Sequence, residues 1–260
     1  MKLLHAALLG SLSLFAIPPA LMASASAQTA ATAPSVDPAA AAALTRMGAY
    51  LRTLRSFEVT VHSSTENVLE SGLKVQTGNK VLYVVEAPGK MFAEVSGDKR
   101  TRQYFYDGAT FTVRGGQNDY YAQVPATGTI PQLMTKVYEK YGINFPLQDL
   151  FRWGDASAVA AKPYQGFLVG TSRVGDWDTD HYVFRQQGVD FQVWIEKGDK
   201  PLPRKMVITN TDDPAQPEYI AILNWNLSPV IPAGRFTYVP DANAHKIPFL
   251  ADAAPAAAAK

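Results

Sequence analysis

The chain has 260 residues, 47% of them hydrophobic, with 24 Lys and Arg against 23 Asp and Glu and no cysteine. The near-neutral charge and the lack of a long basic run argue against a nucleic-acid partner, because neutralising phosphates needs clustered Lys and Arg. Without cysteine, disulfides, thiolate metal sites and lipid attachment to an N-terminal cysteine are excluded, so stability must come from a packed core.

The N-terminal residues have the pattern of an export signal. A short basic start precedes an apolar run from Ala6 to Met22, and Ala25-Ser26-Ala27 is a small-x-small cleavage site. This pattern predicts a secretory signal peptide over residues 1–27, cleaved after Ala27, and a periplasmic product. A retained membrane anchor is the alternative, which Pro18-Pro19 disfavours by interrupting the run.

The rest of the chain has no composition shift that marks a domain boundary. Residues 28–36, rich in Ala, Thr and Pro, are predicted to be a linker, and residues 250–260 a disordered Ala and Pro tail. Between them, residues 37–249 are predicted to form a single domain, long enough to bury a sizeable core.

Two principal helices are predicted. Asp37-Pro38 is an N-cap followed by proline in a first turn, and Leu44, Met47, Leu51 and Leu54 follow at helical spacing. The second helix begins after Thr129, carries its apolar side chains at similar intervals and ends at Gly142. Short helical pieces are expected at Pro146–Phe151 and Asp155–Ala161, on either side of Trp153.

The remaining segments alternate as antiparallel strands do. Asp107-Gly108 is the strongest hairpin signal, and His181–Thr211 contains three strand-like runs with one apolar face. About eleven strands are predicted, from twelve strand-like segments over 57–62, 80–86, 90–95, 103–106, 109–113, 120–124, 165–174, the three runs of 181–211, 218–225 and 235–239.

These elements predict an α+β fold. One antiparallel sheet with so many strands must curl, split or close, and two apolar helix stripes need a partner. We therefore expect a single strongly curved, unclosed sheet, a half-barrel, with the helices covering its concave face. A closed barrel and a two-sheet sandwich are the alternatives.

Several blocks of the sequence resemble a family of predicted periplasmic bacterial proteins of unassigned function: Lys90–Gly97, Tyr104–Gly108, Tyr120–Pro125, Lys140–Ile143 and, most specifically, His181–Thr209 with Gly198–Lys205. The family is placed near the LolA and LolB lipoprotein carriers and the lipid-sensing domain of RseB, and the resemblance spans Asp37 to Val239. It implies a LolA-like half-barrel, whose cavity the carriers use for acyl chains. No ligand-contacting residue transfers from the carriers, so the fold transfers better than the ligand.

No catalytic motif emerges. The chain has no Gly-x-Ser-x-Gly pentapeptide and no zinc spacing, so we predict no catalytic residue, metal ligand set or cofactor. Asp176–His181 is the one concentration of carboxylates beside an imidazole; we interpret it as a turn, with His181 opening a strand, over a metal or acid/base site. Lys99–Arg102, the densest basic patch, is interpreted as a solvated hairpin tip, with an anion site as the alternative.

The function predicted from these features is non-catalytic binding of a lipid, a lipoprotein acyl chain or another hydrophobic ligand, in a cavity between sheet and helices. An envelope protein-interaction or sensor module, contacting its partner through exposed sheet edges or the Trp153 region, is the alternative, and a hydrolase is the least favoured. The apolar strand residues expected to line the cavity, which could instead form an ordinary core, are Leu82, Val84, Phe92, Tyr104, Tyr106, Phe111, Val113, Phe184, Phe191 and Val193.

Overall fold

The computed structural model describes residues 35–98, 100–115, 119–153 and 162–249. The predicted signal peptide, most of the linker, the tail and the helical piece at Asp155–Ala161 lie outside these residues. Among the described residues, no helix combines the length and the apolar character that a bilayer span needs.

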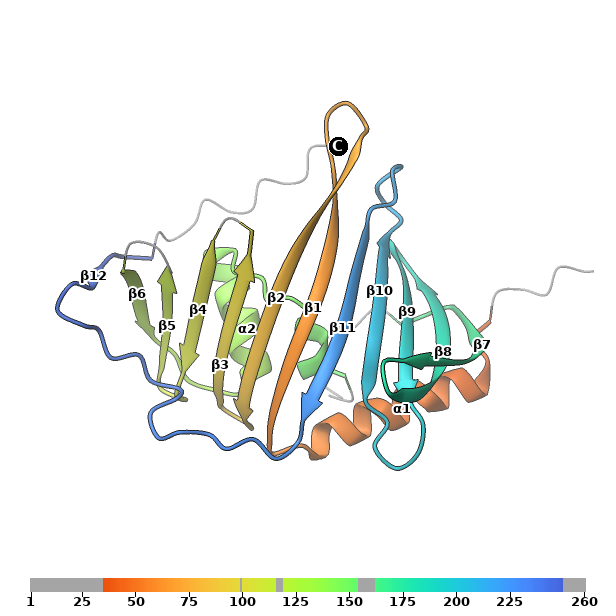
Figure 1. Cartoon of the computed structure of the whole chain (residues 1–260), viewed down its shortest axis with the longest axis horizontal. Coiled ribbons are helices and arrows are strands. Elements are labelled where there is room, and N and C mark those ends of the chain that lie inside the picture. The colour runs from red at the N-terminus through yellow and green to blue at the C-terminus, as the bar shows by residue number, and fades with distance from the viewer. Residues whose placement is uncertain (1–34, 99, 116–118, 154–161, 250–260) are drawn as a thin grey trace, which may run out of the picture. The chain divides into compact units, whose positions relative to one another are not determined.

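One sheet dominates the described part of the chain, and it is not closed (Figure 1). Its order is β12-β6-β5-β4-β3-β2-β1-β11-β10-β9-β8-β7, and every neighbouring pair is antiparallel except β12 with β6. The predicted half-barrel is therefore confirmed, with twelve strands among these residues. Their bounds are β1 Ser56–Val68, β2 Lys74–Glu86, β3 Lys90–Gly97, β4 Thr101–Tyr106, β5 Thr110–Gly115, β6 Tyr120–Pro125, β7 Gln165–Val174, β8 Trp177–Gln186, β9 Val189–Glu196, β10 Pro203–Asn210, β11 Glu218–Asn226 and β12 His245–Lys246.

Both predicted helices form and begin where the sequence predicted. Helix α1 (Pro38–Thr53) begins where the Asp37 carboxylate accepts a hydrogen bond from the amide of Ala39. Helix α2 (Ile130–Tyr141) has a capping box between Thr129 and Gln132 and ends at Gly142, which adopts the left-handed conformation with φ 63°. A single 3-10 turn, η1 (Gln148–Phe151), replaces the short helix expected there.

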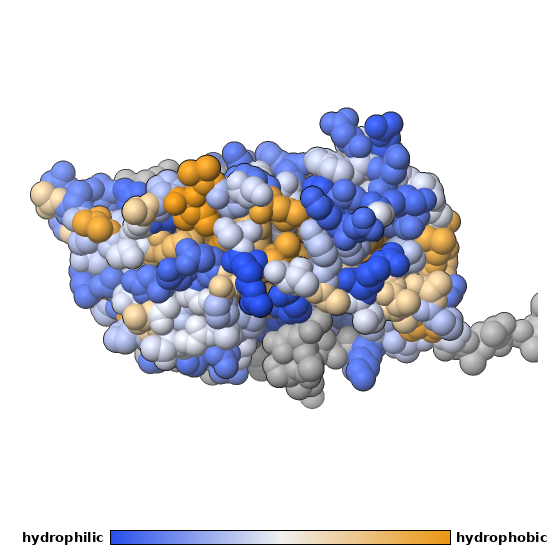
Figure 2. Space-filling view, turned by 90° about the horizontal axis from the view of Figure 1, so that it is seen from below, coloured by the Kyte–Doolittle hydropathy of each residue, from blue (hydrophilic) through white to orange (hydrophobic). Residues whose placement is uncertain are grey.

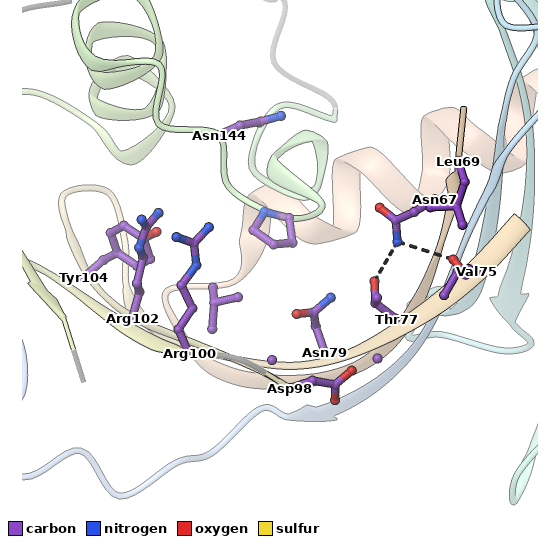
Figure 3. A pocket seen from close by; sticks show the side chains of 14 residues that line it. Asn67, Leu69, Val75, Thr77, Asn79, Asp98, Arg100, Arg102, Tyr104 and Asn144 are labelled. Carbon is purple, nitrogen blue, oxygen red and sulfur yellow. Dashed lines mark hydrogen bonds between the residues drawn. The ribbon is translucent and has the colours of Figure 1, made fainter. Parts of the chain in front are cut away.

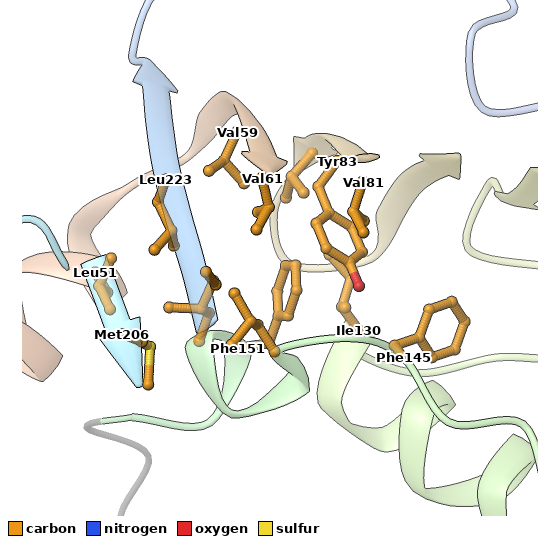
Figure 4. Packing of buried hydrophobic residues seen from close by; sticks show 14 of the residues in the cluster. Leu51, Val59, Val61, Val81, Tyr83, Ile130, Phe145, Phe151, Met206 and Leu223 are labelled. Atoms are coloured by element: carbon orange, nitrogen blue, oxygen red, sulfur yellow. The ribbon is translucent and has the colours of Figure 1, made fainter. Parts of the chain in front are cut away.

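The core lies between the concave face of the sheet and these helical elements (Figure 4). Alternate residues of the central strands, such as Val59 and Val61 of β1 and Tyr83 of β2, point toward the helices. The helices contribute Met47 and Leu51 of α1 and, from α2 and η1, Ile130, Leu133, Met134, Val137, Leu150 and Phe151. This explains why each helix carries a single apolar stripe.

The opposite, convex face of β2 and β3 is also apolar. Leu82, Val84 and Phe92 lie on this face, in a separate cluster with Phe236, and the guanidinium of Arg235 lies 3.8 Å from the centroid of the Phe92 ring. Placing these three strand residues on the helix-covered face was wrong. Every position from 81 to 85 is apolar, so β2 offers no alternation from which the two faces could be told apart.

A C-terminal strap, residues 227–249, covers this part of the convex face. The sequence predicted a strand at 235–239, but the strap is irregular there and reaches the sheet through side chains instead. The Tyr238 ring centroid lies 5.4 Å from that of Phe105 and 5.1 Å from that of Tyr121. Prolines at positions 229, 232 and 240 lack the amide hydrogen that a strand ladder needs.

The hairpin of β1 and β2 extends well beyond its predicted strands and projects past the neighbouring turns (Figure 1). Its outer half pairs Ser64–Val68 with Lys74–Gly78. This half is largely polar on both faces, so it lacks the apolar alternation that reveals a strand. Seen from below, the end of the sheet opposite this tip carries apolar residues in several separate groups among hydrophilic ones (Figure 2).

Candidate ligand-binding pocket

A pocket of about 650 Å3 opens beside the core, at the end of the sheet where the β1–β2 hairpin projects. We call it the rim pocket. Strands β1 to β4 form its floor, and the segment that follows α2 lies above it (Figure 3). Its lining residues are Asn67, Leu69, Val75, Thr77, Gly78, Asn79, Val95, Gly97, Asp98, Arg100, Arg102, Tyr104, Asn144 and Pro146.

The character of the floor changes along one face of β4. Tyr106 and Tyr104 are buried in the core cluster. Arg102 of β4 and Arg100, which lies just before β4 begins, follow at the same two-residue spacing and line the pocket with Tyr104, so all four lie on the concave side. Figure 3 shows both arginine side chains extending from the sheet into the space below Asn144. The strand therefore changes from aromatic to cationic where it leaves the core.

The outer half of the β1–β2 hairpin forms a second side of the pocket. The Asn67 amide nitrogen donates a hydrogen bond to the hydroxyl oxygen of Thr77 at 3.0 Å, which joins the two strands (Figure 3). Leu69 and Val75 are 47% and 45% exposed in spite of their apolar side chains. The hairpin thus presents apolar surface at the pocket that the protein itself leaves uncovered.

The segment above the pocket, residues 142–147, is tied to the sheet by a buried hydrogen bond. The Tyr83 hydroxyl donates to the carbonyl oxygen of Pro146 at 2.7 Å. Burial raises the pKa of Tyr83 well above its usual value, so the hydroxyl stays protonated as a donor. The Phe145 ring also anchors this segment, with its centroid 4.9 Å from that of Tyr104.

Tyr83→Phe tests this link, because it removes the hydroxyl and leaves the carbonyl of Pro146 without its donor. We expect the free energy of unfolding to fall by about 1–2 kcal/mol in urea denaturation. The control is Tyr50→Phe, since the Tyr50 hydroxyl forms no hydrogen bond within the described residues. Equal stabilities for the two variants would mean that the Tyr83 hydroxyl does not hold the segment.

The predicted cavity residues are divided among three places. Tyr104 is the one of the ten that lines the rim pocket. Leu82, Val84 and Phe92 lie under the strap. The remaining six belong to the helix-covered core or pack against it: Tyr106, Phe111, Val113, Phe184, Phe191 and Val193.

Sequence reasoning missed most of the pocket lining. Asn67, Thr77 and Asn79 lie in strand portions that carry no apolar pattern, and Asn144 follows a helix and lies 38 residues after the end of β4. One signal was available, because Arg100, Arg102, Tyr104 and Tyr106 share a period of two. The interpretation of Lys99–Arg102 as a solvated hairpin tip, with an anion site as the alternative, did not use that continuity.

The segment Asp176–His181 lies within and just before β8 instead of forming an extended turn. His181 is in the middle of the strand, not at its start, and its Nε2 lies 2.9 Å from the side-chain oxygen of Gln192. The imidazole stacks on the Trp194 ring at 3.8 Å between centroids, and burial lowers the pKa of His181. These contacts give His181 a packing role on the convex face.

Trp153 packs against the core cluster as a partly buried residue. The residues that follow it, 154–161, lie outside the described part of the chain. The proposal of a partner contact in this region therefore stays a prediction.

Comparison with known proteins agrees with the family expected from the sequence. Residues 40–250 match a family described as "Predicted periplasmic protein (DUF2092)". No curated protein matches the chain.

Solved structures with a related arrangement include LprF from Mycobacterium bovis, at 13% identity and a TM-score of 0.44 over 76% of this chain and 98% of that one. The Mycobacterium tuberculosis lipoprotein LppX matches at 13% identity and a TM-score of 0.44, over 75% of this chain and 98% of that one. A LolA superfamily protein from Nitrosomonas europaea matches at 10% identity and a TM-score of 0.36, over 76% of this chain and 97% of that one. Likeness at this level assigns no ligand to the present chain.

Proposed function

Because this chain belongs to a family of predicted periplasmic proteins, we propose that it is a non-catalytic binding protein of the periplasm. It is exported by a signal peptide over residues 1–27 that is removed after Ala27. The mature protein holds a hydrophobic ligand, such as a lipid or a lipoprotein acyl chain, in the rim pocket.

The observation that carries this proposal is the pocket itself. Its volume of about 650 Å3 falls within the range of about 300–1,000 Å3 for small-molecule sites. Leu69, Val75, Val95, Tyr104 and Pro146 supply apolar surface from both the floor and the overlying segment. Each methylene group that a ligand buries there contributes about 0.8 kcal/mol to its affinity.

The position of the pocket also suits a ligand with a long apolar part. Val95 packs against the core cluster from its edge, and Tyr104 is buried in it. The hairpin residues Leu69 and Val75 lie at the outer side and are about half exposed. A chain-like ligand would cover this outer surface while its end rests against the border of the core.

Blocking the pocket floor tests the proposal. The purified exported protein is extracted with organic solvent and the extract analysed by mass spectrometry, and binding of a fluorescent fatty acid is titrated separately. We expect co-purifying lipid with the wild type, and at least tenfold weaker binding for Val95→Trp because the indole fills the space above β3. Val75→Trp is a second variant, at a position that is 45% exposed, so we expect the larger side chain to leave folding undisturbed.

Val169→Trp is the matched control, because Val169 is 52% exposed on the edge strand β7, away from the pocket. It should bind as the wild type does. A wild-type protein that carries no lipid and ignores fluorescent fatty acids would contradict the proposal, as would unchanged binding in both pocket variants.

A further inference from the structure

We propose that the ligand of the rim pocket is an anionic amphiphile, whose carboxylate or phosphate head is held by Arg100 and Arg102. This inference rests on the proposed function and specifies its ligand class. The starting observation is the same-face alternation of Arg100, Arg102, Tyr104 and Tyr106, which places two cationic groups beside apolar surface on the concave side of the sheet.

The two guanidinium groups are available to a ligand. Within the described residues, neither Arg100 nor Arg102 forms an ion pair, although six other pairs are present among them. Residues two apart in extended chain are about 7 Å apart, so two like charges face the same space, and neither is neutralised by an ion pair with a described residue. An anion placed between the two guanidinium groups would offset the repulsion between their charges and accept hydrogen bonds from both.

The surroundings complete a polar end of the pocket. Asn79 points from the floor toward this space, and Asn144 of the overlying segment also lines the pocket (Figure 3). Their side chains form no hydrogen bond with described residues, unlike that of Asn67. Asp98 also lines the pocket, so the described lining carries two positive charges against one negative charge.

A glycine leaves the room that a head group needs. Gly97 lies opposite Asn79 in the β2–β3 register, and its amide donates to the carbonyl oxygen of Arg100 at 3.0 Å. A Cβ atom at Gly97 would lie 2.5 Å from the side-chain oxygen of Asn79, so a larger residue would fill the space between the polar groups. The cationic end is open, and the apolar lining begins directly beside it at Val95.

The test compares twelve-carbon amphiphiles that differ in head-group charge: dodecanoate, dodecyl phosphate, the neutral monododecanoylglycerol and cationic dodecyltrimethylammonium. Each is titrated into the full exported protein by calorimetry below its critical micelle concentration. We expect the two anions to bind at least tenfold more tightly than the neutral ligand and the cation to bind most weakly. The preference should shrink as salt is raised, because salt screens exposed charges.

The double variant Arg100→Gln/Arg102→Gln should lower the affinity for both anions to that of the neutral amphiphile, whose own affinity should not change. The control Arg46→Gln/Arg173→Gln removes two exposed arginines that also lack ion pairs within the described residues, and it should keep the preference. Acetate and inorganic phosphate, which are heads without tails, should bind far more weakly than dodecanoate.

The outcomes separate this inference from the proposed function. Equal binding of anionic and neutral amphiphiles by the wild type, or a preference that survives in the double variant, overturns the head-group assignment and leaves hydrophobic binding intact. Acetate or phosphate binding as tightly as the amphiphiles overturns it in favour of a plain anion site. If no amphiphile binds the wild type, the proposed function fails as well.

Discussion

Phe151→Ala is expected to lower the free energy of unfolding by about 3–5 kcal/mol, because it empties a ring-sized volume that the surroundings cannot fill. Phe151 is 5% exposed and joins η1 to the sheet. Its ring centroid lies 6.3 Å from that of Phe57 on β1 and 5.3 Å from that of Tyr83 on β2. Because domains commonly unfold at a net cost of about 5–15 kcal/mol, this one change should remove a large share of the stability.

Urea denaturation measures the loss directly, and a thermal scan should show the midpoint falling by about 2–4 °C for each kcal/mol in a domain of this size. Phe167→Ala is the control, since Phe167 is 48% exposed on edge strand β7 and its truncation should change stability by less than about 0.5 kcal/mol. Similar losses in both variants would show that η1 does not close the core.

Truncation at Phe151 should also affect the rim pocket. The carbonyl oxygens of Leu150 and Phe151 accept hydrogen bonds from the Arg52 guanidinium, which fixes η1 to α1. Only a few residues separate η1 from Pro146, which lines the pocket. We therefore expect weaker binding of any pocket ligand at temperatures where Phe151→Ala is still folded.

Gly166→Ala is expected to cost about 3 kcal/mol, the upper end of typical overpacking penalties. Gly166 lies in β7, and a Cβ atom there would be 2.3 Å from a ring carbon of Phe184 and 3.1 Å from the carbonyl oxygen of Val183. Phe184 is 1% exposed and its ring stacks on that of Phe191, with 5.0 Å between the centroids, so moving the ring away from the new methyl group would disturb this packing. The strand itself would have to shift.

A shift of β7 would also disturb the segment that leads into α1. The carbonyl oxygen of Gly166 accepts a hydrogen bond from the Asp37 amide at 2.8 Å. The Gly166 amide donates a hydrogen bond to the carbonyl oxygen of Ser35 at 3.3 Å. Asp37 caps α1, so displacement of β7 would also loosen the first helix. A fall in helical circular dichroism at moderate temperature should accompany the lower unfolding midpoint.

Gly78→Ala is the matched control, because Gly78 also lies within a strand but a Cβ atom there would meet only one backbone oxygen, at 4.0 Å. Its stability should be unchanged or rise by a few tenths of a kcal/mol, since alanine loses less conformational freedom on folding than glycine. If both glycine variants lost the same stability, backbone propensity and not the overlap with Phe184 would be the cause.

The helices and most strands could be predicted from local chemistry. Asp37-Pro38 and Thr129 with Gln132 satisfy free amides at helix starts, and Asp107-Gly108 closes a tight turn in which the Asp107 carboxylate accepts from two amides. These signals act between neighbours in sequence, so they do not depend on the rest of the fold.

The two faces of the sheet could not be separated in the same way. On β2, whose convex side carries the cluster with Phe236, positions 81 to 85 are apolar on both faces and the period of two disappears. Leu82, Val84 and Phe92 were therefore placed wrongly, although their burial was expected. The strap was unpredictable for a related reason, since its contacts are made by Phe236 and Tyr238 in a segment without regular structure.

The amino-acid sequence by itself determined the class of this protein: no cysteine, a strand-rich α+β fold and two helices with one apolar stripe each. Only the tertiary structure decided where a ligand could lie. The rim pocket joins the polar half of one hairpin, the cationic end of β4 and a segment more than forty residues further along the chain. No local sequence pattern encodes this arrangement of lining residues, because it depends on how the curved sheet and α2 bring distant residues together.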